Sequence, residues 1–221
     1  MAVVTVQVND MTVAVPAGVP LLQALAAAGV ALPTLCHHPR LSPVAACRLC
    51  LVELEGTGRP LPACVTIAAE GQRLRTDTPA LQAGRRLIVE LLFAEGNHPC
   101  AVCVADGDCE LQDAARHVGM DLVSVPYRHP SRQVDASHPL FLLDHHRCIL
   151  CSRCVRVCDE IEGAHVWAMA ARGGATRLIA GLDQPWGTVD SCTSCGKCVA
   201  VCPTGALVAR EDVPLGRWHT P

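Results

Sequence analysis

Fifteen cysteines stand in this chain of 221 residues, and eight of them fall into two near-identical runs. The runs are "CILCSRCVRVC" (148–158) and "CTSCGKCVAVC" (192–202), each spaced C-x2-C-x2-C-x3-C. Three cysteines stepped evenly along a loop can reach three irons of one [4Fe–4S] cubane, while the fourth, already in a helix, points towards the other cluster. We therefore expect two [4Fe–4S] clusters, one bound by Cys148, Cys151, Cys154 and Cys202 and the other by Cys192, Cys195, Cys198 and Cys158. Zinc also takes C-x2-C pairs, but zinc sites use two pairs of ligands rather than a duplicated trio plus one.

Four more cysteines form an N-terminal group with the spacing C-x10-C-x2-C-x13-C: Cys36, Cys47, Cys50 and Cys64. In a loop of a hairpin-plus-helix fold, four thiolates at such spacing suit a [2Fe–2S] cluster, although the plant-type pattern C-x4-C-x2-C has a shorter first gap. Four thiolates also close a tetrahedral zinc site, so zinc stays an alternative for this group taken alone.

The last three cysteines lie in "GNHPCAVCVADGDCELQ" (96–112) and have the spacing C-x2-C-x5-C: Cys100, Cys103 and Cys109. Every other cysteine is already assigned, so a third [4Fe–4S] cluster would need another kind of fourth ligand. His98 is the nearest competent donor, and histidine replaces cysteine in some iron–sulfur centres, where it raises the reduction potential. The alternatives are a three-iron cluster or ligation by one of three other residues, Asp106, Asp108 or His117.

Five cationic residues stand close in sequence to the cysteines: Arg40, Arg48, Arg153, Arg156 and Lys197. Cations beside a cluster would offset its negative charge and raise its potential, whereas a solvated surface charge is the plain alternative for each. The glycines of "GTG" (56–58) and "RGG" (172–174) belong to turns and form no phosphate-binding fingerprint. We expect electron-carrying sites and no active site of the chain's own.

Composition excludes several classes of protein. A net charge of −3 and only 3% aromatic residues argue against nucleic-acid binding. The most apolar stretch, 20–35, is interrupted by Gln23, Gly29 and Pro33 and is shorter than the roughly 20 residues that span a bilayer, so we expect no membrane span. The start "MAVVTVQVND" lacks the features of a signal peptide, and an odd number of cysteines would leave one thiol unpaired in an oxidising compartment. We expect a cytoplasmic protein.

The elements that must position these residues can be located from hydrophobic patterning. Alternating apolar residues predict strands at 3–8 and 11–15, joined in a hairpin by Asn9 and Asp10. A short helix at 19–29, with Leu21, Leu22 and Leu25 on one face, should end at Gly29. The remaining predicted elements are strands at 49–56 and 72–78 and helices at 78–96 and 110–120, the first of these helices ending at Gly96.

The fold class is therefore α+β, with a small module for each kind of cluster. We expect a β-grasp [2Fe–2S] ferredoxin-like domain at 1–78 and a small helical His-plus-three-Cys [4Fe–4S] domain at 79–123. A proline-containing linker at 124–139 should lead to a bacterial-type two-[4Fe–4S] ferredoxin domain at 140–221.

This order of modules resembles the N-terminal region of the complex I 75-kDa subunit, the accessory region of [FeFe]-hydrogenases and the iron–sulfur subunits of NAD-linked enzymes. The resemblance covers nearly the whole chain, and four segments carry it: "LCHHPRLSPVAACRLCLVEL", "GNHPCAVCVADGDCELQ", "RCILCSRCVRVCDEI" and "CGKCVAVCPTGAL". The chain ends about twenty residues after Cys202, which leaves no room for a hydrogen-activating or molybdopterin-type domain. Both ferredoxin motifs are intact, and one residue separates His98 from Cys100, where complex I and [FeFe]-hydrogenases usually have three. The chain therefore looks most like the small diaphorase subunit of bidirectional NAD-reducing [NiFe]-hydrogenases.

This resemblance implies a four-subunit complex catalysing H2 + NAD+ ⇌ NADH + H+. In it, a flavin (FMN) subunit would exchange hydride with NAD(H), and this chain would relay single electrons to the small and large subunits of a [NiFe]-hydrogenase. One [2Fe–2S] and three [4Fe–4S] clusters are the implied cofactors. The alternatives are the equivalent subunit of an NAD-dependent formate dehydrogenase, a complex I-like NADH dehydrogenase, or a zinc-loaded scaffold.

Overall fold

The structure of the chain, a computed structural model, describes residues 2–128 and 131–213. The chain divides into two compact units. Unit 1 comprises Met1–His37, Pro43–Val89 and Ala114–Met120, and unit 2 comprises His38–Ser42, Glu90–Asp113 and Asp121–Pro221. No helix in the described ranges is long and apolar enough to cross a membrane.

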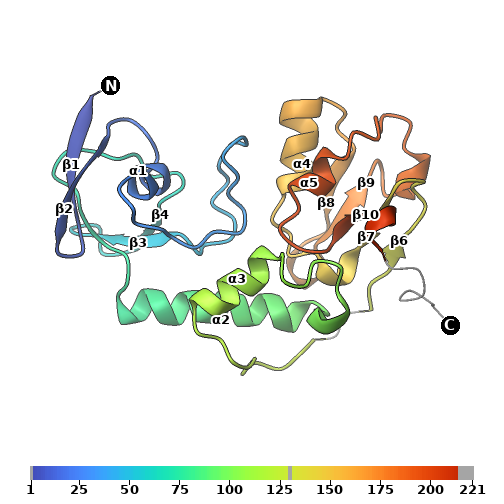
Figure 1. Cartoon of the computed structure of the whole chain (residues 1–221), viewed down its shortest axis with the longest axis horizontal. Helices are drawn as coiled ribbons and strands as arrows, with labels where there is room; N and C mark the ends of the chain where they lie inside the picture. The colour runs from blue at the N-terminus through green and yellow to red at the C-terminus, as the bar shows by residue number, and fades with distance from the viewer. Residues whose placement is uncertain (1, 129–130, 214–221) are drawn as a thin grey trace. The chain divides into compact units, whose positions relative to one another are not determined.

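Unit 1 is built on a five-stranded sheet in the order β2–β1–β5–β3–β4 (Figure 1). Strands β1 and β5 are parallel, and all other neighbours in the sheet are antiparallel. The strands are β1 (Val3–Val8), β2 (Met11–Pro16), β3 (Leu51–Leu54), β4 (Pro60–Pro62) and β5 (Arg73–Arg75). The predicted hairpin is confirmed, and Asn9 makes its turn with a left-handed backbone (φ 55°).

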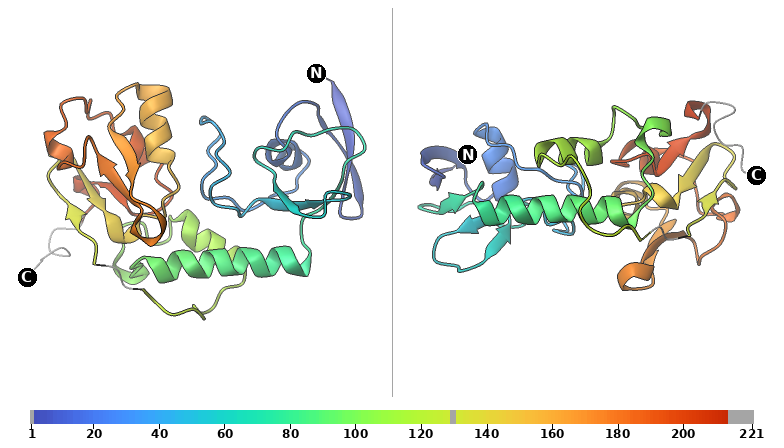
Figure 2. Two further views of the ribbon diagram at one scale, coloured as in Figure 1. Left: turned by 180° about the vertical axis from the view of Figure 1, so that it is seen from behind. Right: turned by 90° about the horizontal axis from the view of Figure 1, so that it is seen from below.

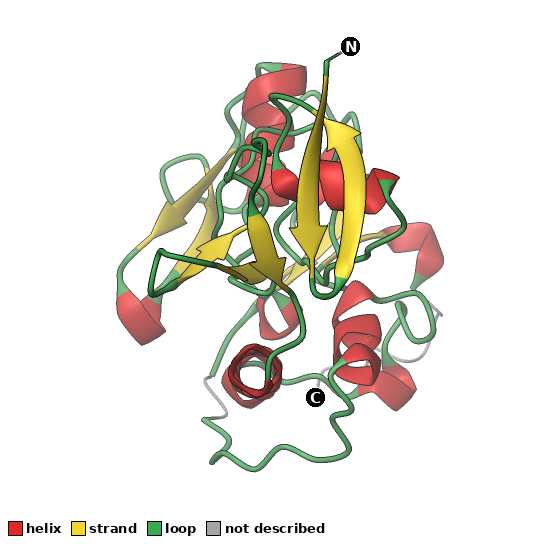
Figure 3. Cartoon of the chain, turned by 90° about the vertical axis from the view of Figure 1, so that its left-hand side faces the viewer, coloured by secondary structure: helices red, strands yellow, loops and turns green. Residues whose placement is uncertain are grey.

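Helix α1 (Leu21–Ala27) supplies the core of unit 1. Its predicted apolar face is confirmed, because Leu21, Leu22 and Leu25 are all buried. In Figure 3 the β1–β2 hairpin stands in front and the helix crosses behind it. Full burial of a leucine side chain contributes about 1.5–3 kcal/mol, so this helix holds the sheet and the cysteine loop that follows it.

Helices α2 (Pro79–Glu95) and α3 (Glu110–His117) both form where the sequence predicts them. Helix α2 is continuous, as Figure 2 shows, and Gly96 follows its last residue as expected. Leu81 is buried, whereas Leu87 and Leu91 are 49% and 43% exposed. Helical spacing therefore identified the helix but not which of its leucines are covered.

Unit 2 combines two small sheets with two short helices. The first sheet has the strand order β10–β7–β6, and strands β8 and β9 form a separate hairpin (Figure 1). These strands were not predicted, and β6 lies inside the stretch expected to be a linker. The bounds are β6 (Val134–Asp135), β7 (Phe141–Asp144), β8 (Trp167–Ala170), β9 (Arg177–Ala180), β10 (Leu207–Ala209), α4 (Arg153–Val157) and α5 (Lys197–Ala200).

Large side chains fill the core of unit 2. Leu143 and Leu207 from paired strands meet Leu178 of β9 and two tryptophans, Trp167 and Trp186. The tryptophan rings contact each other edge to face, with centroids 4.7 Å apart. Cys154, Cys158 and Cys198 from the two cysteine runs are themselves part of this core.

Candidate metal centres

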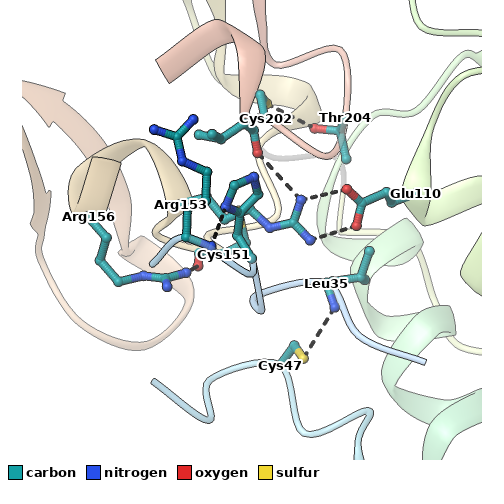
Figure 4. Close-up of polar contacts among 11 residues, drawn as sticks. Leu35, Cys47, Glu110, Cys151, Arg153, Arg156, Cys202 and Thr204 are labelled. Atoms are coloured by element: carbon teal, nitrogen blue, oxygen red, sulfur yellow. Dashed lines mark hydrogen bonds and ion pairs between the residues drawn. The ribbon is translucent and has the colours of Figure 1, made fainter. Parts of the chain in front are cut away.

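The N-terminal group of cysteines lies in a tight loop of unit 1. Cys36, Cys50 and Cys64 are buried, and Cys47 is partly buried. The backbone N–H of Leu35 donates to the sulfur of Cys47 at 3.5 Å (Figure 4). The backbone N–H of Cys47 donates to the sulfur of Cys36, also at 3.5 Å. A hydrogen bond with Cys36 lowers the pKa of Cys47 to about 5. Such donors favour thiolates, the form that binds iron.

Backbone strain and a buried cation shape this loop. Ala45 and Arg48 have positive φ angles of 51° and 58°. The side chain of Arg85, 3% exposed, donates to the carbonyls of Leu49, Leu51 and Thr76 at 2.7–3.0 Å. Sequence reasoning missed Arg85, because its three partners lie 9 to 36 residues away.

The duplicated cysteine runs share one backbone conformation. Leu150 and Ser194 occupy equivalent positions in the two runs and both have φ of 55°. Ser152 and Gly196, the next equivalent pair, have φ of 59° and 70°. A left-handed conformation costs a non-glycine residue about 1–2 kcal/mol, and it persists where the surroundings impose it. The two runs therefore repeat in backbone conformation as well as in sequence.

The last cysteine of each run borders the cavity formed by the first three cysteines of the other run. One cavity, with about 330 Å³ of empty space, is bordered by Cys148, Cys151, Cys154 and Cys202. A second, with about 320 Å³, is bordered by Cys158, Cys192, Cys195 and Cys198. The two sets of four that the spacing predicted as ligand sets therefore each surround one enclosed space.

The cavity around Cys148 is the more deeply buried. Burial raises the pKa of Cys148 to about 11 and that of Cys151 to about 12, although backbone N–H groups hydrogen-bond to both sulfurs. Thr204 lies 3.8 Å from the sulfur of Cys202 through its hydroxyl (Figure 4). Burial of this kind disfavours free thiolates, and a bound cation would supply the compensating positive charge.

Three of the four cysteine sulfurs at the second cavity accept hydrogen bonds from neutral groups. The indole Nε1–H of Trp186 donates to the sulfur of Cys192 at 3.3 Å, and the backbone N–H of Val166 donates to Cys158 at 3.3 Å. A hydrogen bond from the Trp167 side chain reaches Cys198. Hydrogen bonds to cluster sulfurs help to set reduction potentials.

His98 completes a third cavity. About 310 Å³ of empty space is bordered by His98 and the three cysteines predicted to act with it, Cys100, Cys103 and Cys109. The Nε2 atom of His98 is buried and has no hydrogen-bond partner among the described residues. The ring also hydrogen-bonds to the backbone of Leu92, and burial lowers its pKa to about 4. A neutral imidazole with one nitrogen on a backbone group and the other free is the usual state of a metal ligand.

The alternative ligands are less well placed. Asp106 accepts a hydrogen bond from the side chain of Gln112 at 2.8 Å. Among the described residues, neither Asp106 nor Asp108 borders the His98 cavity. His117 ends α3 and belongs to unit 1.

Three of the five cations noted in the sequence have partners in unit 2. Arg153 is buried and pairs with both carboxylate oxygens of Glu110, at 2.5 and 2.6 Å (Figure 4). Arg156 is buried and donates to the carbonyl of Ser42 at 2.6 Å, and Lys197 forms an ion pair with Glu162. Buried arginines with defined partners are structural parts of the site.

The donor sets fit clusters of several irons. Within residues 2–128 and 131–213, no three His, Cys, Asp or Glu side chains stand close enough together to hold a single metal ion. The three groups of four in unit 2 instead border enclosed spaces of nearly equal size. Thiolate sulfurs with one imidazole nitrogen are the donors that iron–sulfur clusters take.

Comparisons with known families give the same order of modules. A family model described as "2Fe-2S iron-sulfur cluster binding domain" matches residues 1–79. The "NADH-ubiquinone oxidoreductase-G iron-sulfur binding region" matches 85–123, and the "NADH-quinone oxidoreductase subunit 3, ferredoxin-like domain" matches 138–208. The predicted fold class and the presence of both [2Fe–2S] and [4Fe–4S] clusters are confirmed.

Relatives of two lengths share this arrangement. The NADPH-Fe(3+) oxidoreductase subunit alpha of Geobacter sulfurreducens is 39% identical over 98% of this chain, and the mitochondrial NADH dehydrogenase [ubiquinone] iron-sulfur protein 1 of Solanum tuberosum is 34% identical over 94%. The chain spans about a quarter of the length of these proteins. By contrast, the gamma chain of the NAD-reducing hydrogenase HoxS of Cupriavidus necator is 31% identical, with 97% of this chain and 92% of that one aligned.

A solved structure has the same fold. A chain in the crystal structure of an NAD+-reducing [NiFe]-hydrogenase in the H2-reduced state superposes with a TM-score of 0.87 and 36% identity. The match covers 100% of this chain and 91% of that chain.

Proposed function

Because the chain belongs to the family of iron–sulfur electron-transfer subunits that includes the HoxS gamma chain, we propose that it connects a flavin-bearing NAD(H) subunit to a [NiFe]-hydrogenase. The relay would run through one [2Fe–2S] and three [4Fe–4S] clusters. The proposed ligands are the four sets predicted from the sequence: Cys36, Cys47, Cys50 and Cys64; His98, Cys100, Cys103 and Cys109; Cys148, Cys151, Cys154 and Cys202; and Cys158, Cys192, Cys195 and Cys198. The reaction of the whole complex would be H2 + NAD+ ⇌ NADH + H+.

The observation that carries the cluster assignment is the match between cavities and ligand sets. In each of three cavities, the bordering residues include one complete predicted set of four. In the duplicated runs this match requires Cys158 and Cys202 to change places, an arrangement characteristic of two-cluster ferredoxins. A chance grouping of four thiols would not place Cys158 and Cys202 each with the other run.

The chain's own residues would hold and tune the clusters, whose irons accept and release single electrons. Cysteines that are mostly buried or partly buried would fix each cluster and limit its contact with water. N–H donors such as that of Trp186 would stabilise the negative charge on sulfur. Catalysis on hydrogen or NAD(H) would take place on partner subunits, which supply the flavin and the nickel.

A relative and a solved structure support the hydrogenase partner. The HoxS gamma chain and the superposed hydrogenase chain are each matched over more than nine-tenths of their length. The matches to NADH dehydrogenase and NADPH-Fe(3+) oxidoreductase subunits make a complex I-like dehydrogenase the second candidate, together with a formate dehydrogenase. The metal that co-purifies distinguishes them: nickel supports the hydrogenase, whereas molybdenum or tungsten would support a formate dehydrogenase.

The proposal has two further parts, the compartment and the domain boundaries. Thiolate ligands need a reducing compartment, so we place the protein in the cytoplasm. We also keep the domain boundaries at 1–78, 79–123 and 140–221, with 124–139 between the last two.

The direct test of the relay uses the assembled complex. Cys154→Ser or Cys198→Ser should each remove a cubane ligand and strongly reduce hydrogen-driven NAD+ reduction. NADH–dye activity of the flavin subunit should persist, because those electrons leave before this chain. The chain alone should show no turnover with hydrogen, NADH or formate. Full hydrogen-driven activity in both variants would contradict the relay.

A further inference from the structure

Arg147 is a buried cation on the wall of the His98 cavity that the sequence did not single out. Its side chain is 4% exposed, and its Nη1 donates to the sulfur of Cys103 at 3.2 Å. Arg147 also borders the cavity itself, together with Thr204 and Gly205. A guanidinium buried this deeply against a proposed cluster ligand can act on the cluster both by its charge and by its N–H bond.

The position of this guanidinium is fixed from several sides. Its Nε lies 3.1 Å from Oδ2 of Asp144, which is 7% exposed, and the hydroxyl of Thr204 donates to the Arg147 carbonyl at 2.8 Å. Asp144 is itself held, since its Oδ1 accepts from the backbone N–H of His146 at 2.9 Å. The donor is therefore rigid, and its distance to the Cys103 sulfur is set by the fold.

The backbone of Gly205 also lies close to this sulfur. A β-carbon built on Gly205 would lie 2.9 Å from the Cys103 sulfur and 3.3 Å from the β-carbon of Ala105. The partly buried sulfur therefore has a backbone segment and a buried guanidinium beside it, and these surroundings are less polar than water. Charges and hydrogen bonds act more strongly in such surroundings than in water.

We propose that Arg147, held by Asp144, raises the reduction potential of the cluster bound by His98, Cys100, Cys103 and Cys109. Reduction adds one electron, and so one negative charge, to the cluster. A fixed cation and an N–H···S bond both stabilise the reduced form more than the oxidised form. Asp144 limits the effect, because its carboxylate offsets part of the charge of Arg147. This inference rests on the proposed ligand set for the His98 cavity.

The charge argument gives opposite signs for the two partners. Arg147→Gln removes the cation and leaves the Asp144 carboxylate uncompensated, so the potential should fall. Asp144→Asn leaves the cation uncompensated, while the amide oxygen can still accept from His146, so the potential should rise. In the double variant both charges are removed, so the net charge of the pair is unchanged and the main loss is the guanidinium N–H···S bond. The potential should therefore lie between that of Arg147→Gln and that of the unsubstituted protein. Arg147→Lys keeps the charge and should recover part of the loss.

The experiment is a potentiometric titration of the full chain carrying its clusters, prepared anaerobically and followed by electron paramagnetic resonance. We expect Arg147→Gln to lower the equilibrium constant for one-electron reduction at least tenfold, which is about 59 mV. The matched control is Arg177, which pairs with Asp183 in the same unit and borders none of the three cavities in the described part of the chain. Arg177→Gln and Asp183→Asn should leave the potential unchanged.

The outcomes distinguish failure of the Arg147 inference from failure of the ligand assignment. If the iron content is kept and the potential of the His98 cluster is unchanged in Arg147→Gln and in Asp144→Asn, the inference is overturned and the ligand assignment stands. Shifts of the same sign in both variants would also overturn it, because they would report a loss of packing. Absence of a third cubane signal from the unsubstituted chain would overturn the assignment itself, and the inference with it.

Discussion

Replacing Gly96 with alanine should displace the His98 ring without removing the histidine. Gly96 follows the last residue of α2, and a β-carbon built on it overlaps Nε2 of His98 and lies 2.8 Å from the ring's Cδ2. The same β-carbon would lie 2.8 Å from the carbonyl oxygen of His146, which already accepts from the backbone N–H of Asn97 at 2.9 Å. Because the backbone on that side is held, the imidazole is the group that must move.

The required movement is large for a metal ligand. Restoring an ordinary contact of about 3.4 Å to Nε2 needs a shift of that atom by about 1 Å. Metal–ligand distances in a well-formed site hold to within about 0.2 Å. We therefore expect the imidazole to leave its iron, and the cluster to lose between about one and four irons per chain, depending on whether a three-iron cluster persists. Overpacking of this kind costs about 1–3 kcal/mol of stability, which leaves the chain folded.

The assay compares iron content and electron paramagnetic resonance spectra of anaerobically prepared chains. Gly84→Ala is the matched control, because Gly84 lies within α2 and a β-carbon there meets nothing within 4 Å. That control should keep all its iron and gain up to about 1 kcal/mol of stability from alanine's helix propensity. A Gly96→Ala chain with full iron and unchanged spectra would refute the assignment of Nε2 of His98 as a ligand.

Three further predictions use the same preparations. His98→Ala should lose or convert the cluster proposed to be bound by His98, whereas His98→Cys should keep a cubane there at lower potential. Unchanged spectra in His98→Ala would make Asp106 or Asp108 the next candidate for the fourth ligand. Trp186→Phe should lower the potential of the Cys192 cluster, because the N–H donor to sulfur is lost, and should lower the free energy of unfolding by about 1–2 kcal/mol; a redox titration with no shift would contradict this. Burial raises the pKa of Cys148 to about 11 and that of Cys151 to about 12, whereas iron binds thiolates. Reconstitution of the iron-free chain with iron and sulfide should therefore become faster as the pH rises from about 6.5 to about 8.5. A reconstitution rate independent of pH would argue against buried thiol ligands.

The grouping of residues around the three cavities of unit 2 could be predicted because the information for it is local. A run such as 148–158 carries its spacing within eleven residues, and the exchange of Cys158 and Cys202 follows from the helix that each run enters. The place of His98 beside this group of cysteines could be predicted for the same reason, since it stands two residues from Cys100. Hydrophobic patterning likewise located α1, α2 and α3, whose apolar faces repeat over two or more turns.

Other parts of the fold depend on contacts that no local pattern encodes. Strands β6 to β10 have only two to four residues each, too few to show alternation. Strand β4 (Pro60–Pro62) begins and ends with proline, a residue that sequence rules exclude from most strands but that an edge strand tolerates. Arg147 was missed because the sulfur it contacts lies 44 residues earlier, and the importance of Gly96 depends on the position of a side chain two residues on.

The central claim is that four ligand sets hold four clusters, and iron analysis tests it most directly. Anaerobically prepared full-length chain should contain about 14 irons, two in the [2Fe–2S] cluster and twelve in three [4Fe–4S] clusters. Mössbauer spectra of the same sample should divide the iron between the two cluster types in that ratio. A reproducible value near ten irons, with only two cubane signals, would contradict the account.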